Sequence, residues 1–249
     1  MKRRVFVKSL VALAATCYFP TMSTAKPKSK TRRLKIKEGM TILFQGDSIT
    51  DAMRKREANR SGHNNPYGYG YGYMFIAASE VLRRHPEAGL KIYNRGISGN
   101  KVCQLQERWE KDCFALKPDV LSILIGINDH WHTTTGRFEG SPERYEREYR
   151  ALLRETRERL PEVKLVIGEP FILDGSAVKA DWYPVVAEYR AIARRLAEEF
   201  GAIFIPYQQI FDEALKQAPA SYWLRDGVHP TAAGARLMAD AWLDHVFGY

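Results

Sequence analysis

The sequence has little cysteine and no apolar run long enough to span a bilayer. Three Cys among 249 residues exclude a disulfide-rich scaffold. The longest candidate run, from Ser9 to Phe19, is too short for a transmembrane helix. With 45% hydrophobic and 27% charged residues, the chain is neither collagen-like nor wholly disordered. Its length predicts one domain with a sizeable core.

Acidic residues are missing from the first 37 positions, which hold eleven Lys and Arg. These eleven account for the whole net charge of +9, because the remaining 27 bases face 29 acids. The folded part of the chain is therefore close to neutral, and a nucleic-acid partner is not predicted.

The N-terminus has the pattern of a targeting segment, with basic residues, an apolar run and small residues ending at Ala25. The string RRVFVK resembles a twin-arginine export signal. We therefore predict an export signal at residues 1–25, a basic flexible tail at 26–38 and the main domain at 39–249. The protein would be periplasmic or secreted, with no stable membrane insertion once the signal is removed. A lipoprotein anchor at Cys17 and an uncleaved signal anchor remain alternatives.

Removal of the signal would leave Cys103 and Cys113 in an oxidising compartment. On one predicted helix they would lie about 15 Å apart, too far to bridge. We expect two buried free thiols.

Short apolar runs alternate with longer amphipathic segments along the main domain. Apolar and polar residues do not alternate along these runs, as expected of strands that are covered on both faces. Regular alternation of strand and helix predicts parallel βαβ units and hence a three-layer α/β/α sandwich. The predicted strands are Thr41–Gln45, Leu90–Asn94, Val120–Ile125, Lys164–Gly168 and Ala202–Pro206, and the main helices are Tyr145–Leu160, Tyr183–Phe200 and Thr231–Phe247.

Ligands bind beyond the carboxyl ends of parallel strands, so the loops after the strands should carry the chemistry. GDS follows the first strand, with Ser48 at a strand-to-helix turn, and DGVHP precedes the last helix. Ser48 is the candidate nucleophile, His229 its base, and Asp226 the acceptor that fixes the imidazole tautomer. The backbone N–H groups of Ser48 and Gly99 and the Asn128 amide are candidate oxyanion donors. This chemistry needs no cofactor and no metal.

The segments GDSIT, NRGISGN, GIND and DGVHP together resemble the four blocks of the SGNH hydrolases, also called the GDSL esterase/lipase superfamily. The resemblance covers about residues 42–247 and implies a flavodoxin-like sheet of about five strands. It also implies the roles given above for Ser48, Gly99, Asn128, Asp226 and His229. The fuller pattern GDSITD, NRGISG, WE, ALKPD and IGIND is similar to that of bacterial acetyl xylan esterases. It implies removal of O-acetyl groups from plant polysaccharide.

Four side chains are candidates for contacts to substrate. Asp47 precedes the nucleophile, and Tyr67 and Tyr69 belong to the tyrosine-rich segment NNPYGYGYGY, whose rings could stack on sugars or pack in the core. Trp131 is a candidate wall of the cleft, with core packing as its alternative.

Next to Trp131, His130 and His132 form a His-x-His that invites comparison with a zinc site. No third ligand is suitably spaced, so no metal is predicted.

Two other functions stay open. A lysophospholipase or thioesterase would have an apolar tunnel beside Ser48, where an acetylesterase has a small cavity. A catalytically silent carbohydrate-binding protein would be expected to lack Ser48, His229 or Asp226, and all three are present. The sequence leaves a homo-oligomer open.

Overall fold

The structure is a computed structural model that describes residues 33–249. Five parallel strands form one sheet in the order β2-β1-β3-β4-β5, as the alternating pattern predicted. Each predicted strand is found with both ends within one residue. The strands are β1 (Thr41–Gly46), β2 (Lys91–Asn94), β3 (Val120–Leu124), β4 (Lys164–Gly168) and β5 (Ile203–Ile205).

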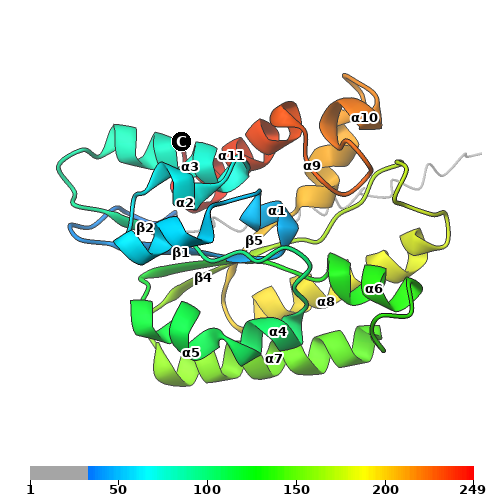
Figure 1. Ribbon diagram of the computed structural model, residues 1–249, viewed down its shortest axis with the longest axis horizontal. Coiled ribbons are helices and arrows are strands. Elements are labelled where there is room, and N and C mark those ends of the chain that lie inside the picture. Colours follow the sequence, from blue (N-terminus) through cyan, green and yellow to red (C-terminus); the bar gives the residue numbers. More distant parts are fainter. Residues whose placement is uncertain (1–32) are drawn as a thin grey trace, which may run out of the picture. The chain divides into compact units, whose positions relative to one another are not determined.

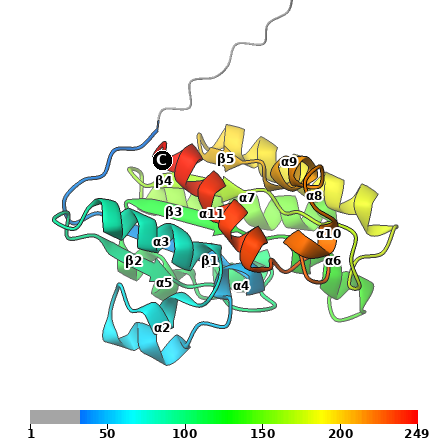
Figure 2. The ribbon, with the colours of Figure 1, turned by 90° about the horizontal axis from the view of Figure 1, so that it is seen from above.

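Helices cover both faces of this sheet, which confirms the three-layer α/β/α architecture (Figure 1). One face carries α3 (Tyr73–Arg84), α9 (Tyr207–Ala214) and α11 (Ala232–Val246), and α11 lies beside α3 over the sheet (Figure 2). The other face carries α4 (Val102–Glu107), α5 (Trp109–Asp112), α7 (Pro142–Arg159) and α8 (Trp182–Glu199). Short elements lie in the connections: α1 (Ser48–Asp51), η1 (Arg56–Ser61), α2 (Pro66–Tyr69), η2 (Phe114–Leu116), α6 (Ile127–Thr134) and α10 (Ala220–Trp223).

Successive strand residues point to opposite faces, so the sheet separates two hydrophobic cores. Phe44 packs against Trp242 of α11, with ring centroids 4.8 Å apart, whereas its neighbour Leu43 faces the core beneath α4 and α7. The indole of Trp242 donates to the Ser122 hydroxyl at 3.0 Å, which satisfies two buried polar groups together. Burial on both faces explains why β1 and β3 show no polar alternation, whereas residues of the edge strand β2 alternate in burial.

The helix expected to carry both Cys103 and Cys113 is broken at Arg108 into α4 and α5. The break lets the Arg108 guanidinium reach the ends of β1 and β2, where it donates to Gln45 Oε1 and to the Arg95 carbonyl, both at 2.9 Å. Both cysteines are free, as expected, but only Cys113 is buried.

Residues 33–38 were predicted to be part of a flexible tail, and this is wrong. Leu34 and Ile36 pack against the hydrophobic core, and the Leu34 N–H donates to the Val246 carbonyl at 2.7 Å. Their alternating apolar side chains gain more by burial than an exposed tail would allow. The predicted export signal, the Cys17 alternative and the rest of the tail lie outside the described residues. Residues 33–249 include no helix with the length and hydropathy of a membrane span.

Candidate active site

Ser48, His229 and Asp226 form a continuous hydrogen-bonded chain. Ser48 is the first residue of α1, directly after β1, and its Oγ lies 2.9 Å from Nε2 of His229. Nδ1 of His229 lies 2.7 Å from Oδ2 of Asp226. This is the geometry of a nucleophile, a base and a group that orients the base.

The loop of Asp226 is built to hold an ionised carboxylate. Oδ1 of Asp226 accepts the backbone N–H groups of Val228 at 3.0 Å and of His229 at 2.7 Å. Burial by itself raises the pKa of Asp226, but the hydrogen bonds from the His229 backbone, the His229 ring and the Val228 backbone outweigh it, so the pKa lies below 3.8. A carboxylate that stays charged at neutral pH keeps the proton of the imidazole on Nδ1 and leaves Nε2 free to accept.

The predicted oxyanion donors lie at the ends of three neighbouring strands. The backbone N–H groups of Ser48 and Gly99 have no acceptor within residues 33–249. Gly99 has a φ of +81°, which favours glycine. A Cβ at this position would have only one neighbour within 4 Å, Cε1 of the His132 ring at 3.7 Å. The Asn128 amide donates to the Asn100 carbonyl at 3.3 Å, which orients it beside the Gly99 loop. All three donors therefore remain candidates for an oxyanion hole.

We expect Asn128→Ala to lower kcat for ester hydrolysis by about 10²- to 10³-fold, because one oxyanion donor is lost where charge develops. KM should change much less, since the ground-state carbonyl is bound weakly. Steady-state kinetics on a small acetate ester measures both. A matched control is Asn64→Ala, because the Asn64 amide donates to the Leu90 carbonyl at 2.7 Å beside β2. An Asn128→Ala enzyme with wild-type kcat would remove Asn128 from the oxyanion hole.

Two buried carboxyl groups support the loops of the site without joining the triad. Asp47 caps α1 by accepting the Ile49 N–H at 3.0 Å, and Asp129 accepts the Val102 N–H at 3.3 Å. Burial raises the pKa of Asp47 to about 7 and that of Asp129 to about 8. The position of Asp47, 1% exposed, fits a helix cap better than the substrate contact that the sequence suggested.

Protonation of Asp129 makes stability depend on pH. Its folded-state pKa of about 8 lies above the unfolded value, so the folded state binds more protons between these values and the free energy of unfolding falls as pH rises through that range. Asp129→Asn keeps an acceptor for the Val102 N–H and removes the titratable carboxyl group, and with it this contribution to the pH dependence of the free energy of unfolding. Relative to wild type, we expect the variant to gain at least about 1 kcal/mol between pH 5 and pH 8.5, measured by urea unfolding. A parallel pH dependence in both proteins would contradict a neutral Asp129.

The tyrosine-rich segment packs against the turn that follows α1. A Cβ on Gly70 would lie 2.4 Å from the Asp51 carbonyl, and one on Gly72 would lie 2.7 Å from Cβ of Ala52, so both positions require glycine. The alternating chain buries Tyr69 and Tyr73 in the core and leaves Tyr71 exposed. Glycine occupies these alternate positions because Gly70 and Gly72 lie against the chain at Asp51 and Ala52, where a side chain would not fit.

The three predicted aromatic contacts have different outcomes. Tyr69 is buried, and its hydroxyl donates to Asn64, so the prediction of a substrate contact there is wrong. Tyr67 is exposed, with the Lys55 ammonium 4.9 Å from its ring centroid, but it does not line the cavity at Ser48. Trp131 packs against His229, with ring centroids 5.9 Å apart, and against the hydrophobic core, and it does not line this cavity either.

Ser48 and His229 open into a cavity of about 330 Å³. Its lining includes residues that the sequence analysis did not assign, namely Met53, Tyr71 and Arg225. Arg225 directly precedes Asp226 in the chain, which was the available signal for it. The other lining residues are Ile49, Asp51, Ala52, Gly72, Ser98, Pro230, Thr231, Ala232 and Ala235.

His130 and His132 point to different neighbours. The His130 ring packs edge-on against Trp182 at 4.9 Å, and Nδ1 of His132 lies 3.2 Å from Nζ of Lys101. Burial lowers the pKa of both histidines. No cluster of three His, Cys, Asp or Glu suited to a metal is present from residue 33 onward.

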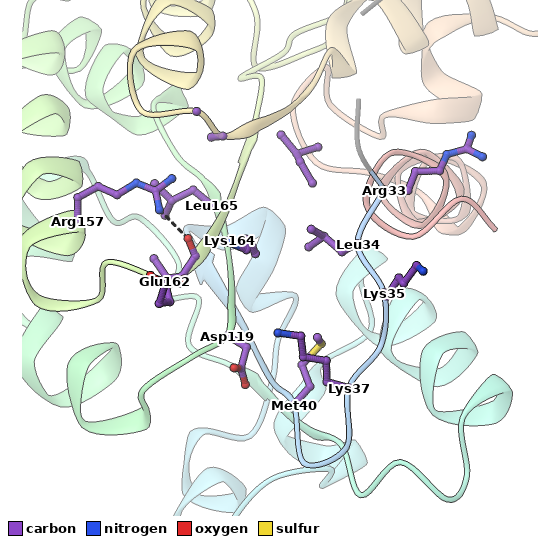
Figure 3. Close-up of a pocket in the computed structure, with 14 residues that line it drawn as sticks. Arg33, Leu34, Lys35, Lys37, Met40, Asp119, Arg157, Glu162, Lys164 and Leu165 are labelled. Carbon is purple, nitrogen blue, oxygen red and sulfur yellow. Dashed lines mark hydrogen bonds between the residues drawn. The ribbon is translucent and has the colours of Figure 1, made fainter. Parts of the chain in front are cut away.

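A larger cavity, of about 880 Å³, lies at the amino ends of the strands (Figure 3). Figure 3 shows Lys35 and Lys37 on the N-terminal segment, across from Arg157, whose guanidinium donates to the Val163 carbonyl. Its lining contains no Ser, Thr, Cys or His. Because it offers no hydroxyl or thiol nucleophile and no imidazole base, the serine esterase chemistry belongs to the smaller cavity.

The chain is similar to several known proteins. The model of the GDSL-like Lipase/Acylhydrolase family matches residues 44–237. The acetylxylan esterase of Geobacillus stearothermophilus is 36% identical over 215 residues, which are 86% of this chain and 96% of that protein. A solved structure of an acetylxylan esterase from Geobacillus stearothermophilus has a TM-score of 0.74 and covers 85% of this chain and 96% of its own at 34% identity. A solved structure from Parabacteroides merdae, of a protein named as a GDSL-like lipase, has a TM-score of 0.83 at 51% identity and covers 86% of this chain and 98% of its own.

Proposed function

Because the chain belongs to the GDSL-like lipase/acylhydrolase family, we propose that it is a serine esterase that removes acetyl or other short acyl groups from a carbohydrate such as acetylated xylan. Two kinds of observation support this proposal. The hydrogen-bonded chain of Ser48, His229 and Asp226 supplies the chemistry. The similarity to an acetylxylan esterase suggests the acyl group and the kind of alcohol.

In the proposed mechanism, Nε2 of His229 accepts the proton of Ser48 as its Oγ attacks the ester carbonyl. The backbone N–H groups of Ser48 and Gly99 and the Asn128 amide stabilise the oxyanion. His229 then protonates the departing sugar oxygen, and an acyl group remains on Ser48. Water activated by the same imidazole repeats the sequence and releases the carboxylic acid.

The cavity beside Ser48 is the observation that favours a short acyl group. Small side chains line it at Ala52, Ala232 and Ala235, together with the polar groups of Asp51 and Thr231. A long acyl chain would need a continuous apolar tunnel to bury its methylenes, at about 0.8 kcal/mol each. A cavity of about 330 Å³ with charged and hydroxyl groups in its wall fits an acetyl ester better than a lipid.

Acetate release from acetylated xylan tests the proposal, with 4-nitrophenyl acetate and a dodecanoate ester run in parallel. We expect acetate from the polysaccharide and faster turnover of the acetate ester than of the dodecanoate. Preference for the long ester would make the protein a lipase or lysophospholipase. Absence of turnover on every ester would favour a carbohydrate-binding protein without catalysis.

We also propose that the protein is exported through its twin-arginine-like segment, for which the string RRVFVK is the support. Cell fractionation of a bacterium that expresses the full-length chain should find the mature protein outside the cytoplasm. Replacement of Arg3 and Arg4 by Lys should retain it inside, and unchanged export of that variant would contradict this route.

A further inference from the structure

Arg225 adds a cationic side chain to the lining of the cavity that contains Ser48. Its backbone N–H donates to the His229 carbonyl at 3.0 Å, so its position is tied to that of the base. Its side chain is exposed and lines the cavity. No carboxylate, ring or other side chain in the described part of the chain pairs with its guanidinium.

The acid in the wall of this cavity does not neutralise Arg225. Oδ2 of Asp51 lies 3.0 Å from the Arg56 guanidinium and accepts the Ser98 N–H at 2.9 Å, and its Oδ1 lies 3.5 Å from Nε of Arg54. The carboxylate of Asp226 is likewise engaged by His229 and Val228. Neither Asp51 nor Asp226 therefore pairs with Arg225, whose exposed side chain lines the cavity.

Apolar side chains lie exposed along the same cavity. Tyr71 is 76% and Met53 81% exposed, although both are large hydrophobic residues that usually gain from burial. The Tyr71 N–H donates to the Ala52 carbonyl at 2.9 Å, and Gly70 and Gly72 pack beside it on the same turn. The backbone of Tyr71 is therefore fixed next to the nucleophile helix while its ring stays free to contact a ligand.

We propose that the sugar that carries the ester also carries a carboxylate, which Arg225 binds while Tyr71 contacts the face of the sugar ring. The planar guanidinium matches a carboxylate with two parallel hydrogen bonds, and an aromatic ring packs on the C–H face of a sugar. The substrate class would then be O-acetylated uronic or other acidic sugars. This inference rests on the proposed esterase function and narrows its substrate.

Charge recognition at an exposed site should act mainly on binding. A guanidinium that holds the carboxylate equally in the ground state and the transition state lowers KM and leaves kcat nearly the same. We expect the full-length enzyme to prefer an O-acetylated methyl glucuronoside over the matching O-acetylated methyl glucoside by about tenfold in kcat/KM, with the difference in KM. Added salt should reduce this preference, because exposed charges are screened.

The test compares these two sugars with Arg225→Gln, Arg225→Lys and the control Arg154→Gln. Arg154 is also exposed, but it lies on α7 on the other face of the sheet. We expect Arg225→Gln to remove most of the preference by raising KM for the glucuronoside, Arg225→Lys to keep part of it, and Arg154→Gln to retain it. Tyr71→Ala should weaken turnover of both sugars, whereas Tyr71→Phe should preserve it.

Several results would overturn the inference. Equal kcat/KM of the wild type for the charged and uncharged sugars would do so, as would an equal fall on both sugars in Arg225→Gln, which indicates a structural role. Preference for an O-acetylated glucose 6-phosphate over the glucuronoside would show that the site recognises a phosphate and not a carboxylate. O-acetylated N-acetylneuraminate, run alongside, distinguishes a sialic acid from a uronic acid as the source of the carboxylate.

Failure of this inference can be distinguished from failure of the proposed function. Ser48-dependent release of acetate from vinyl acetate without any sugar preference would reject this inference alone, whereas no release would reject the esterase itself.

Discussion

Ser48→Ala is expected to lower kcat for acetate esters by about 10⁴-fold or more. The variant retains the oxyanion donors and the base but has no atom that can form an acyl intermediate. Its residual rate should reflect hydrolysis by water in the same cavity. Initial rates on 4-nitrophenyl acetate, corrected for the uncatalysed reaction, give this ratio.

Loss of fold does not explain such a result, because the Ser48 hydroxyl makes one hydrogen bond, to His229. Its removal should change the free energy of unfolding by about 1 kcal/mol or less. Ser98→Ala is the matched control, since Ser98 lines the same cavity and its backbone N–H, not its hydroxyl, contacts Asp51. A Ser48→Ala enzyme with activity close to that of Ser98→Ala would remove Ser48 as the nucleophile.

Asp226→Asn is expected to lower kcat by about 10³- to 10⁴-fold while leaving the loop intact. The asparagine carbonyl can still accept the backbone N–H groups of Val228 and His229. Its NH₂ group would face Nδ1 of His229, which favours the tautomer with the proton on Nε2, and such an imidazole cannot accept the proton of Ser48. Kinetics across pH 6–9 would measure the loss at each pH.

Asp244→Asn provides the control for Asp226→Asn. Asp244 is an exposed acid of α11 whose partner, Arg33, lies 2.7 Å away at the surface. Removal of such a pair costs about 1 kcal/mol or less and should leave kcat within about twofold. A kcat for Asp226→Asn within tenfold of wild type would show that the carboxylate does not set the tautomer of His229.

The strands and the order of the blocks could be predicted because each is a local property of the chain. Continuous apolar runs such as Val120–Leu124 require burial on both faces, and parallel strands bring their carboxyl ends to one edge. The contact between Ser48 and His229, which are 181 positions apart, could be predicted only from the resemblance of GDSIT and DGVHP to known blocks. Membership of the GDSL-like family is confirmed by the match over residues 44–237.

Local pattern was a poor guide where tertiary contacts decide the direction of a side chain. Tyr69 and Tyr71 have the same neighbours in sequence, yet one is buried and the other exposed, because Gly70 must face the Asp51 carbonyl. Arg108 ends α4 since its guanidinium gains acceptors at the ends of β1 and β2, which the helical periodicity of residues 102–112 does not reveal. The position of Arg225 in the cavity could not be predicted, because no sequence pattern distinguishes an exposed arginine at a binding site from one elsewhere on the surface.

The central claim is that Ser48 carries the acyl group during turnover. The most direct measurement quenches the wild-type enzyme in acid during steady-state hydrolysis of 4-nitrophenyl acetate and locates the added acetyl group by peptide mass spectrometry. The account predicts one acetyl group on the peptide that contains Ser48, and none on that peptide in Ser48→Ala. An acetyl group on another residue whose substitution abolishes turnover, while Ser48→Ala remains active, would contradict it.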